Sequence, residues 1–263
     1  MDSRIDLPAG AQTSQRYISA PSTNLMIPTG SDLQMGTQAL FGQRFDLISS
    51  ENGAARGALY SIIQDQDRID YIGTVPAISV SDGPHAPTHC VEALAAAVFE
   101  SADIKSKLLG SLPRNAAVQG VVQHEFLYVE GRGYIHLKHL RDVKAVSPRD
   151  YTEVAKDMLG LPYIWGGTGH IGVDCSGLVQ SALAATGVDA PRDTDQQEAS
   201  LGRGASYGQR QAGDLVFWPG HVGIVIDGDR LLHANAFHMC VAIEPIETAV
   251  ARIGAISSVK RLT

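Results

Sequence analysis

The feature that most constrains the fold of this chain is a change of hydrophobic periodicity near residue 147. Before it, short apolar runs such as ALYSIIQ (58–64) and IDYIGTVPAISV (69–80) alternate with stretches rich in Gly, Asn and Asp. That pattern is typical of small all-β modules. After it, Tyr151 and Val154 begin a run of apolar residues at helical spacing. The chain is therefore expected to combine all-β modules with a later domain that contains helices.

This pattern divides the chain into four parts. The opening segment lacks periodicity and is rich in Ser, Thr, Pro and Gly, which predicts an extended arm. ALYSIIQDQDRIDYIGTV and EFLYVEGRGYIHLKHL each place a strand, a polar turn and then Tyr-Ile in a second strand, which predicts two diverged copies of one small β-barrel. The last part should run helix, glycine-rich loop, helix and four strands, an α+β domain. The expected bounds are 1–30 for the arm, 31–81 and 82–146 for the two barrels, and 147–263 for the α+β domain.

Composition and charge narrow the class of protein. The 263 residues include 21 Lys and Arg against 28 Asp and Glu, a net charge of -7. A negative field argues against binding nucleic acid or an anionic membrane. No stretch approaches the roughly 20 apolar residues of a membrane span, and the opening residues contain no apolar signal region, so a cytoplasmic location is expected. Three cysteines without paired or metal-like spacing predict reduced thiols and no cofactor.

Cys175 lies where the glycine-rich loop YIWGGTGHIGV (163–173) turns into the helix DCSGLVQSAL (174–183). One interpretation is structural, because Cys175 extends the apolar stripe of that helix and a lone cysteine on such a face is often a small buried residue. The other is catalytic, because the unpaired N–H groups and positive dipole end of a first helical turn favour a thiolate and can hold an oxyanion. Asp174, just before it, suits the N-cap position.

A cysteine nucleophile needs a base, and HVGIVIDGDRLLHAN (221–235) offers two histidines on a predicted β-hairpin. If the turn centres on Asp227, His221 and His233 lie directly opposite each other. If it centres on Gly228, they are diagonal neighbours. Both registers place the two imidazoles on one sheet face, whereas a half-residue shift of the turn would separate them. The alternative is that both are polar residues at strand edges.

The other histidines and cysteines of interest are expected to be structural. A zinc site built from Cys175, His221 and His233 has suitable ligand types, but its spacings fit none of the compact zinc patterns, so no metal is expected. The residues expected to lie in the core or at the surface, without a catalytic role, are His170, His238, Cys90 and Cys240.

Five segments together resemble the successive motifs of the NlpC/P60 cysteine peptidases. They are YIWGGTGHIGVDCSGLVQSAL, PRDTDQQ, GDLVFW, HVGIVI and LLHAN, in the family's order. The resemblance implies a papain-like catalytic domain with Cys175 as nucleophile, His221 as base and His233 as the group that orients His221. The two β modules resemble bacterial SH3 (SH3b) domains.

The resemblance also implies a set of residues around the substrate. The oxyanion would be stabilised by the backbone N–H of Cys175 and the hydroxyl of Tyr163. The family often has Ser where Thr194 stands, which keeps the hydroxyl and adds a methyl group. The residues expected to line the cleft are Tyr163, Asp174, Ser176, Asp193 and Thr194.

Two SH3b modules before an NlpC/P60 domain are similar to the arrangement of γ-D-glutamyl-L-diamino acid endopeptidases. That likeness implies hydrolysis of the γ-D-Glu to diamino acid bond in free muropeptides with an unblocked N-terminal L-Ala, as in peptidoglycan recycling. The muropeptide is the expected binding partner, and the protein is expected to be a monomer. Tyr71 is the candidate for binding the substrate amine, or else a core aromatic, and Glu51 and Asp70 are possible acidic partners. The alternatives are a remodelling endopeptidase acting on intact peptidoglycan, an acyltransferase, and an inactive wall-peptide-binding protein.

Overall fold

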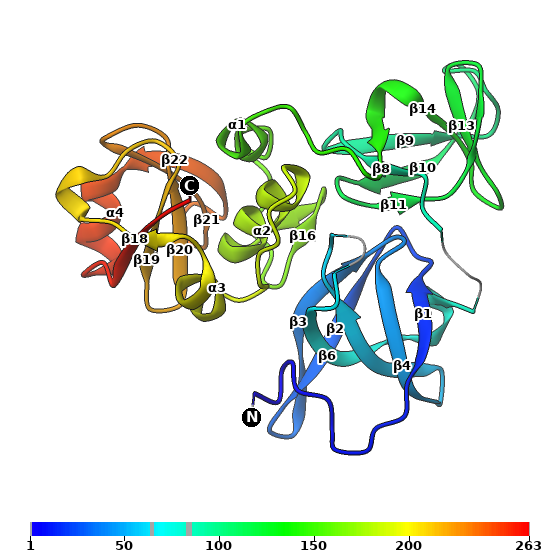
Figure 1. Cartoon of the computed structure of the whole chain (residues 1–263), viewed down its shortest axis with the longest axis horizontal. Helices are drawn as coiled ribbons and strands as arrows, with labels where there is room; N and C mark the ends of the chain where they lie inside the picture. The colour runs from blue at the N-terminus through cyan, green and yellow to red at the C-terminus, as the bar shows by residue number, and fades with distance from the viewer. Residues whose placement is uncertain (1, 64–65, 83–85, 263) are drawn as a thin grey trace. The chain divides into compact units, whose positions relative to one another are not determined.

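The computed structural model describes residues 2–63, 66–82 and 86–262. The chain folds into two compact units, Met1–Ser147 and Pro148–Thr263 (Figure 1). The first unit is built from strands, and the second combines helices with a sheet, so the protein is of the α+β class. No helix among the described residues is long and apolar enough to cross a membrane.

The first unit begins with an antiparallel seven-stranded sheet in the order β3-β2-β6-β5-β4-β1-β7. Strands β4 and β5 are joined by Asn52 and Gly53, whose positive φ angles of 52° and 78° suit a two-residue hairpin turn. Apolar side chains, including Leu25 and Phe45, fill the core on one side of the sheet. The elements are β1 (Ser14–Ile18), β2 (Ser22–Thr29), β3 (Asp32–Leu40), β4 (Arg44–Glu51), β5 (Ala54–Tyr60), β6 (Ile69–Pro76), η1 (Ala77–Ser79) and β7 (Val80–Ser81).

The extended arm expected for residues 1–30 instead contributes two strands, β1 and β2, to this sheet. In β2, Thr23 and Leu25 are buried while Asn24 between them is exposed, which is the alternation of a half-buried strand. A register shift between Leu25 and Met26 interrupts this alternation, so the segment shows no continuous period of two residues. The first β module therefore begins well before residue 31.

The remainder of the first unit holds a five-stranded sheet, β10-β9-β14-β13-β12, and a three-stranded sheet, β11-β8-β15, around a second core. Neither these sheets nor the seven-stranded one closes into a barrel among the described residues. The elements are β8 (His89–Val91), β9 (Ala95–Phe99), β10 (Leu108–Pro113), β11 (Ala117–Val118), β12 (Val121–Gln123), β13 (Phe126–Val129), β14 (Gly133–His136), η2 (Leu137–His139) and β15 (Leu140–Asp142).

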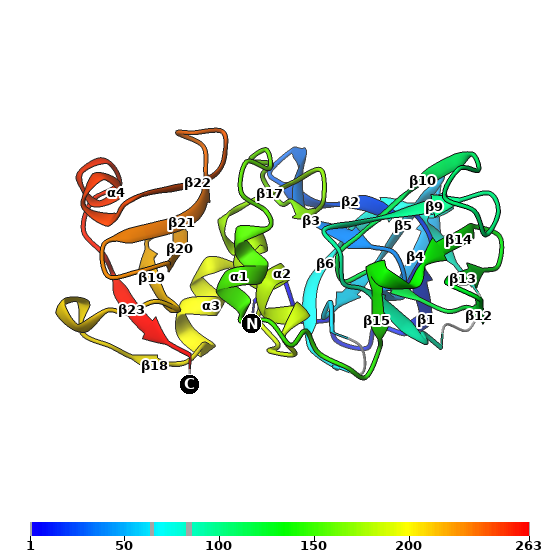
Figure 2. The same cartoon turned by 90° about the horizontal axis from the view of Figure 1, so that it is seen from above.

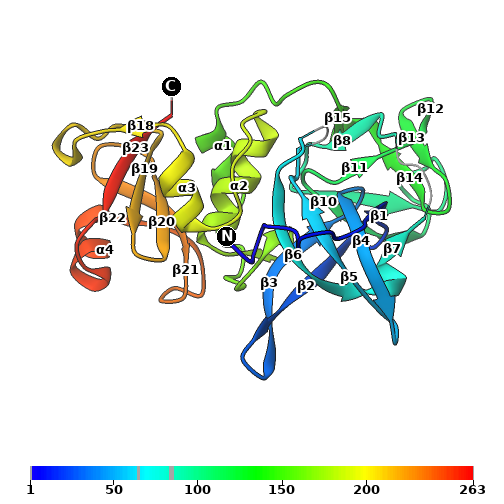
Figure 3. The ribbon, with the colours of Figure 1, turned by 60° about the horizontal axis from the view of Figure 1, so that its bottom comes forward.

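The second unit is organised around a six-stranded sheet in the order β18-β23-β19-β20-β21-β22 (Figure 3). Helix α2 packs against α1 and against strands β20 and β21 of this sheet (Figure 2). The elements are α1 (Tyr151–Lys156), β16 (Thr168–Gly169), β17 (Gly172–Val173), α2 (Cys175–Ala185), α3 (Thr194–Ser200), β18 (Arg203–Gly204), η3 (Tyr207–Gln209), β19 (Asp214–Trp218), β20 (His221–Val225), β21 (Arg230–Asn235), β22 (Cys240–Pro245), α4 (Ile246–Ile253) and β23 (Ser258–Arg261).

Candidate active site

Helix α2 begins where the glycine-rich loop ends, and Asp174 caps it. The Asp174 carboxylate accepts hydrogen bonds from the backbone N–H groups of Gly177 (2.7 Å) and Gly166 (2.8 Å). A Cβ on Gly177 would lie 2.1 Å from the carbonyl oxygen of Gly167, so glycine is needed for the loop to approach this closely. The N-cap fixes Cys175 in the first turn of the helix. The capping role expected of Asp174 is confirmed.

Arg192, which the sequence analysis did not single out, pairs with the same carboxylate. Its Nη1 and Nη2 donate to Asp174 Oδ1 (3.0 Å) and Oδ2 (2.7 Å), and Nη1 also donates to Ser176 Oγ (2.8 Å). Two backbone N–H groups, two guanidinium N–H groups and the Ser176 hydroxyl (3.4 Å) thus occupy the acceptor sites of the Asp174 carboxylate. A substrate could bind Asp174 only by displacing one of them. The substrate contacts expected of Asp174 and Ser176 remain predictions.

The Cys175 thiol is buried beside the first turn of α3 and the start of β20. Its Sγ lies 3.8 Å from Thr194 Oγ1 and 4.0 Å from the carbonyl oxygen of Gly220. Burial, and then the negative charge of Asp174, raise the pKa of the thiol to about 11. Both causes oppose the thiolate that the helix end is expected to favour, and that expectation remains a prediction. A thiol held in its neutral form needs a base before it can act as a nucleophile.

His221 and His233 meet on one face of the β20–β21 hairpin. The strands pair Ile224 with Leu232, so the turn centres on Gly228 and the histidines are diagonal neighbours. Nε2 of His221 lies 2.8 Å from Nδ1 of His233. Burial lowers the pKa of His221 to about 3 and that of His233 to about 4, so both rings are neutral at neutral pH. Of the two registers that the sequence allowed, the structure has the one whose turn centres on Gly228.

Two further residues extend this pair. His233 Nε2 lies 2.7 Å from Glu244 Oε1, and Arg252 donates from Nη1 to Glu244 Oε2 (3.0 Å) and from Nη2 to Oε1. Although burial acts to raise the pKa of Glu244, hydrogen bonds from Arg252 and His233 and the positive charge of Arg252 lower it. A buried carboxylate therefore lies at the far end of the histidine pair.

The sequence analysis missed Glu244 and Arg252 because it did not predict strand β22. The available signal was the acid within the apolar run CVAIEP. Strand β21 pairs His233 with Ala242, which places Glu244 two residues further along on the same face. Recognising this second hairpin would have found the acid.

Of the other residues expected to line the cleft, Thr194 contacts the thiol, Asp193 caps a helix and Tyr163 is half-buried. Thr194 begins α3 and is the one next to the thiol, whereas Asp193 is the N-cap of α3 in a capping box with Gln196. Tyr163 is half-buried, and burial together with the nearby Cys175 raises the pKa of its hydroxyl to about 12. That hydroxyl stays protonated at neutral pH and can donate a hydrogen bond.

The three residues considered for the substrate amine all lie in the first unit. Tyr71 is 5% exposed and belongs to the hydrophobic core of the seven-stranded sheet. Asp70 is buried and paired with Arg68, whereas Glu51 is exposed at the end of β4. The structure thus gives Tyr71 the core position that the sequence analysis held as the alternative, and an amine-binding role remains a prediction.

The remaining residues of catalytic type lie outside this arrangement or at its edge. Cys90 is buried in the first unit, and Cys240 begins β22. His238 is exposed, and its Nδ1 lies 3.0 Å from Asn235 Oδ1. Ligand atoms of His233, His238 and Glu244 lie within 4.8 Å of one another and could in principle hold a metal ion. That set includes neither Cys175 nor His221.

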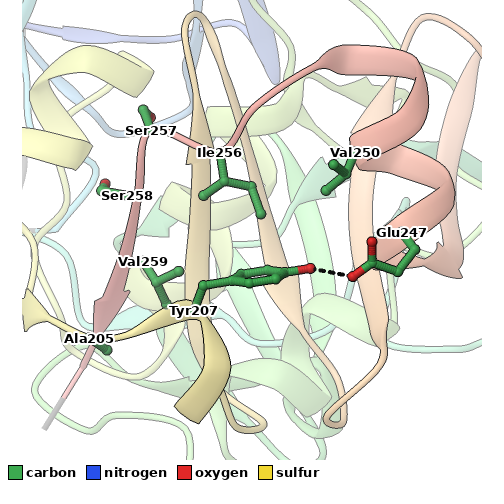
Figure 4. A pocket seen from close by; sticks show the side chains of 8 residues that line it. All are labelled: Ala205, Tyr207, Glu247, Val250, Ile256, Ser257, Ser258 and Val259. Carbon is green, nitrogen blue, oxygen red and sulfur yellow. Dashed lines mark hydrogen bonds between the residues drawn. The ribbon is translucent and has the colours of Figure 1, made fainter.

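A separate hollow of about 420 Å³ lies between η3, α4 and β23 (Figure 4). Tyr207 donates a hydrogen bond to Glu247 across it (2.7 Å), beside Val250 and Ile256. No candidate catalytic residue lines this hollow.

A thiol in the first turn of a helix, packed against a strand that begins with a paired histidine, is the arrangement of enzymes with a cysteine nucleophile. Residues 160–253 match the sequence model of the NlpC/P60 family. The second unit therefore carries an NlpC/P60 family domain.

Curated relatives match part of the chain. The chain is 38% identical over 96 residues to a gamma-D-glutamyl-L-lysine dipeptidyl-peptidase of Bacillus subtilis, covering 34% of this chain and 32% of that protein. It is 37% identical over 126 residues to the bifunctional muramidase/DL-endopeptidase CwlT of Bacillus subtilis, covering 43% of this chain and 36% of that protein. The alignments thus span about a third of the length of these relatives.

One solved structure matches almost the whole chain. It is an NlpC/P60 family protein from Bacillus cereus, with a TM-score of 0.79 and 20% sequence identity, covering 94% of this chain and 99% of that chain. At this identity the match shows a shared fold, which extends over the β-rich first unit as well as the NlpC/P60 domain.

Proposed function

We propose that the protein is a cysteine peptidase that hydrolyses the amide bond between the γ-carboxyl of D-Glu and the amine of an L-diamino acid in muropeptides. The observation that carries the proposal is a buried thiol at a helix start, packed beside a strand that begins with a histidine paired to a second histidine. Cys175 sits at a capped helix end, and His221 is oriented by His233 at 2.8 Å on the adjoining strand. The relatives named gamma-D-glutamyl-L-lysine dipeptidyl-peptidase support this bond as the target.

The mechanism follows from which ring nitrogen is free. Because Nε2 of His221 is bonded to His233, Nδ1 of His221 is left to accept the Cys175 proton. The sulfur then attacks the amide carbonyl, and the Cys175 N–H and Tyr163 hydroxyl would hold the oxyanion. His221 returns the proton to the departing amine and leaves a thioester. It next deprotonates a water molecule, which cleaves the thioester and releases the γ-D-Glu acid and free Cys175.

We propose further that the substrate is a free muropeptide with an unblocked L-Ala amine, and that the two β-rich parts of the first unit are SH3b modules. The relatives named gamma-D-glutamyl-L-lysine dipeptidyl-peptidase support a substrate with a free amino end. A site that takes a free amine has to bind the ammonium with an acceptor or a carboxylate, since a buried unpaired charge is costly. A cytoplasmic, monomeric enzyme of peptidoglycan recycling fits this substrate.

The test compares L-Ala-γ-D-Glu-L-Lys and its diaminopimelate counterpart with free and with N-acetylated amines, with products identified by mass spectrometry. We expect cleavage after D-Glu and a loss of kcat/KM of about 100-fold or more on acetylation, the scale of a few kcal/mol for an unpaired buried group. Equal cleavage of both forms, or release of peptides from whole sacculi, would overturn the free-amine proposal. It would favour wall remodelling, the activity suggested by the DL-endopeptidase relative.

The same products separate the remaining alternatives. An amine adduct of the L-Ala-γ-D-Glu fragment, in place of the free acid, would identify an acyltransferase. No change in any peptide would identify a binding protein.

A further inference from the structure

The hydrogen-bonded chain that begins at His221 ends on a carboxylate. His221 Nε2 contacts His233 Nδ1 at 2.8 Å, and His233 Nε2 contacts Glu244 Oε1 at 2.7 Å. The His233 side chain is 0% exposed and that of Glu244 is 7% exposed, so protein groups rather than water set these contacts. The position of each proton in the chain can therefore be worked out from the acceptors.

The proton positions follow from the acid at the end. Arg252 donates to both oxygens of Glu244, which stabilises the ionised carboxylate, and an ionised carboxylate can only accept. His233 must therefore donate from Nε2. A neutral imidazole carries one N–H, so Nδ1 of His233 is an acceptor and His221 must donate to it from Nε2. Nδ1 of His221 is then left with its lone pair.

We propose that Glu244, held by Arg252, is a positioning residue that sets the tautomers of both imidazoles and so makes Nδ1 of His221 the base for Cys175. The catalytic consequence rests on the proposed function, whereas the tautomers do not. The Glu244–Arg252 pair has no net charge, so it orients His233 without requiring that ring to become positive. The Arg252 guanidinium also lies over the Phe237 ring, 4.3 Å from its centroid, which helps to fix it in place.

The variant that tests this is Glu244→Gln, because it keeps the shape of the side chain and adds a donor. With an amide at this position, the NH₂ group must face either His233 or Arg252. Facing His233, it donates to Nε2 and reverses both tautomers, which places a proton on Nδ1 of His221. Facing Arg252, it opposes the N–H of Nη1, while the amide oxygen still accepts from Nη2 and from His233, so this orientation keeps the wild-type tautomers. The matched control is Glu247→Gln, the same substitution at an exposed acid on α4.

The primary measurement is ¹⁵N NMR of histidine-labelled full-length protein in EDTA at pH 7, with His221 and His233 assigned by His→Gln variants. We expect the wild-type and Glu247→Gln proteins to carry the proton on Nε2 of both rings. Glu244→Gln should show a population of His221 with protonated Nδ1 that is absent from the wild type, in the molecules whose amide NH₂ faces His233. Glu244→Asp, which stays acceptor-only, should keep the wild-type tautomers. A wild-type spectrum with Nδ1–H on either ring overturns the proposal without any variant.

The second measurement is the rate at which iodoacetamide alkylates Cys175, followed by peptide mass spectrometry across pH. Loss of a residue that orients a functional side chain typically lowers the activity or affinity of the site by about 10- to 100-fold. We expect a fall of that size in Glu244→Gln and none in Glu247→Gln. An unchanged rate in a folded Glu244→Gln protein whose spectrum shows protonated Nδ1 on His221 contradicts the proposal. Neither measurement uses a peptide substrate, so failure to cleave muropeptides would reject the proposed function and leave the tautomer assignment standing.

Discussion

Two buried carboxylate–arginine pairs flank the candidate active site, and they differ in what else the acid contacts. On the helix side, Asp174 and Arg192 have side chains 10% and 1% exposed, and the acid's remaining capacity is taken by backbone N–H groups of the cap. On the sheet side, Glu244 pairs with Arg252, which is 23% exposed, and its other contact is the His233 ring. The same ion pair thus has a structural role in one place and bears on proton transfer in the other.

The function of each carboxylate depends on the group that it contacts besides its arginine, and not on the ion pair itself. A carboxylate bonded only to N–H groups that do not titrate near neutral pH can fix geometry and little else. A carboxylate bonded to an imidazole determines which nitrogen of that ring carries a proton. We therefore expect substitutions on the helix side to act on stability and on the thiol, and those on the sheet side to act on proton transfer.

The largest expected effect is the loss of peptide cleavage when the candidate nucleophile on the helix side is removed. Cys175→Ala should abolish peptide cleavage, because no other group can form the thioester. The side chain is 7% exposed, so a small residue should be accommodated and the circular dichroism spectrum should be retained. Cleavage is followed by mass spectrometry of the products. Cys90→Ala, in the first unit, is the control and should retain activity, whereas an active Cys175→Ala protein would reject the cysteine-peptidase function.

The next prediction compares the two arginines directly. Arg192→Met should lower the free energy of unfolding by about 3–5 kcal/mol, because it leaves a buried carboxylate without its counter-charge. Arg252→Met should cost about 1 kcal/mol, because its guanidinium is 23% exposed and water can replace part of the interaction. Urea unfolding of both variants measures the difference. Equal losses would show that the two pairs are equivalent in stability, contrary to the comparison.

The residues on the helix side of the site could be predicted from the sequence more completely than those on the sheet side, for physical reasons. Asp174 and Cys175 are adjacent in sequence at a helix start, so their roles follow from local rules for capping and dipoles. Glu244 depends on a strand pairing whose turn contains Met239 at a φ of 54°, a conformation that its residue type does not signal. Its partner Arg252 is brought in by a different element, helix α4.

Arg192 and the pKa of Cys175 could not be predicted for a related reason. Arg192 lies 18 residues from Asp174, and its pairing depends on how α2 packs against the segment before α3. The raised pKa of the thiol depends on burial, which the sequence left open between two interpretations of the same helix. Likewise, strand β2 could not be predicted from alternation, because a register shift between Leu25 and Met26 interrupts its period of two residues.

A smaller effect on activity should separate orientation from proton transfer on the sheet side. His233→Gln should retain more activity than His233→Ala, because an amide oxygen can still accept the hydrogen bond from Nε2 of His221. We expect kcat to differ about tenfold between the two variants, with KM similar, since neither change touches the thiol or the helix cap. Equal losses in the two variants would mean that His233 itself moves a proton.

The smallest expected effect is on the pH dependence of the free energy of unfolding, to which His233 on the sheet side contributes. In the folded protein burial lowers the pKa of His233 to about 4, whereas the unfolded chain binds that proton near pH 6.5. The unfolded state therefore takes up more protons as the pH falls below about 6.5, and stability should fall until the folded ring also protonates near pH 4. Between pH 7 and 5.5 this amounts to about 1 kcal/mol for His233, which urea unfolding at the two pH values can resolve. His233→Gln should reduce the slope, because it removes the titrating ring, and a control substitution of the exposed His238 by Gln should not. If His233→Gln leaves the slope unchanged, other groups carry the acid sensitivity, and the buried neutral ring that the sheet side requires is not present.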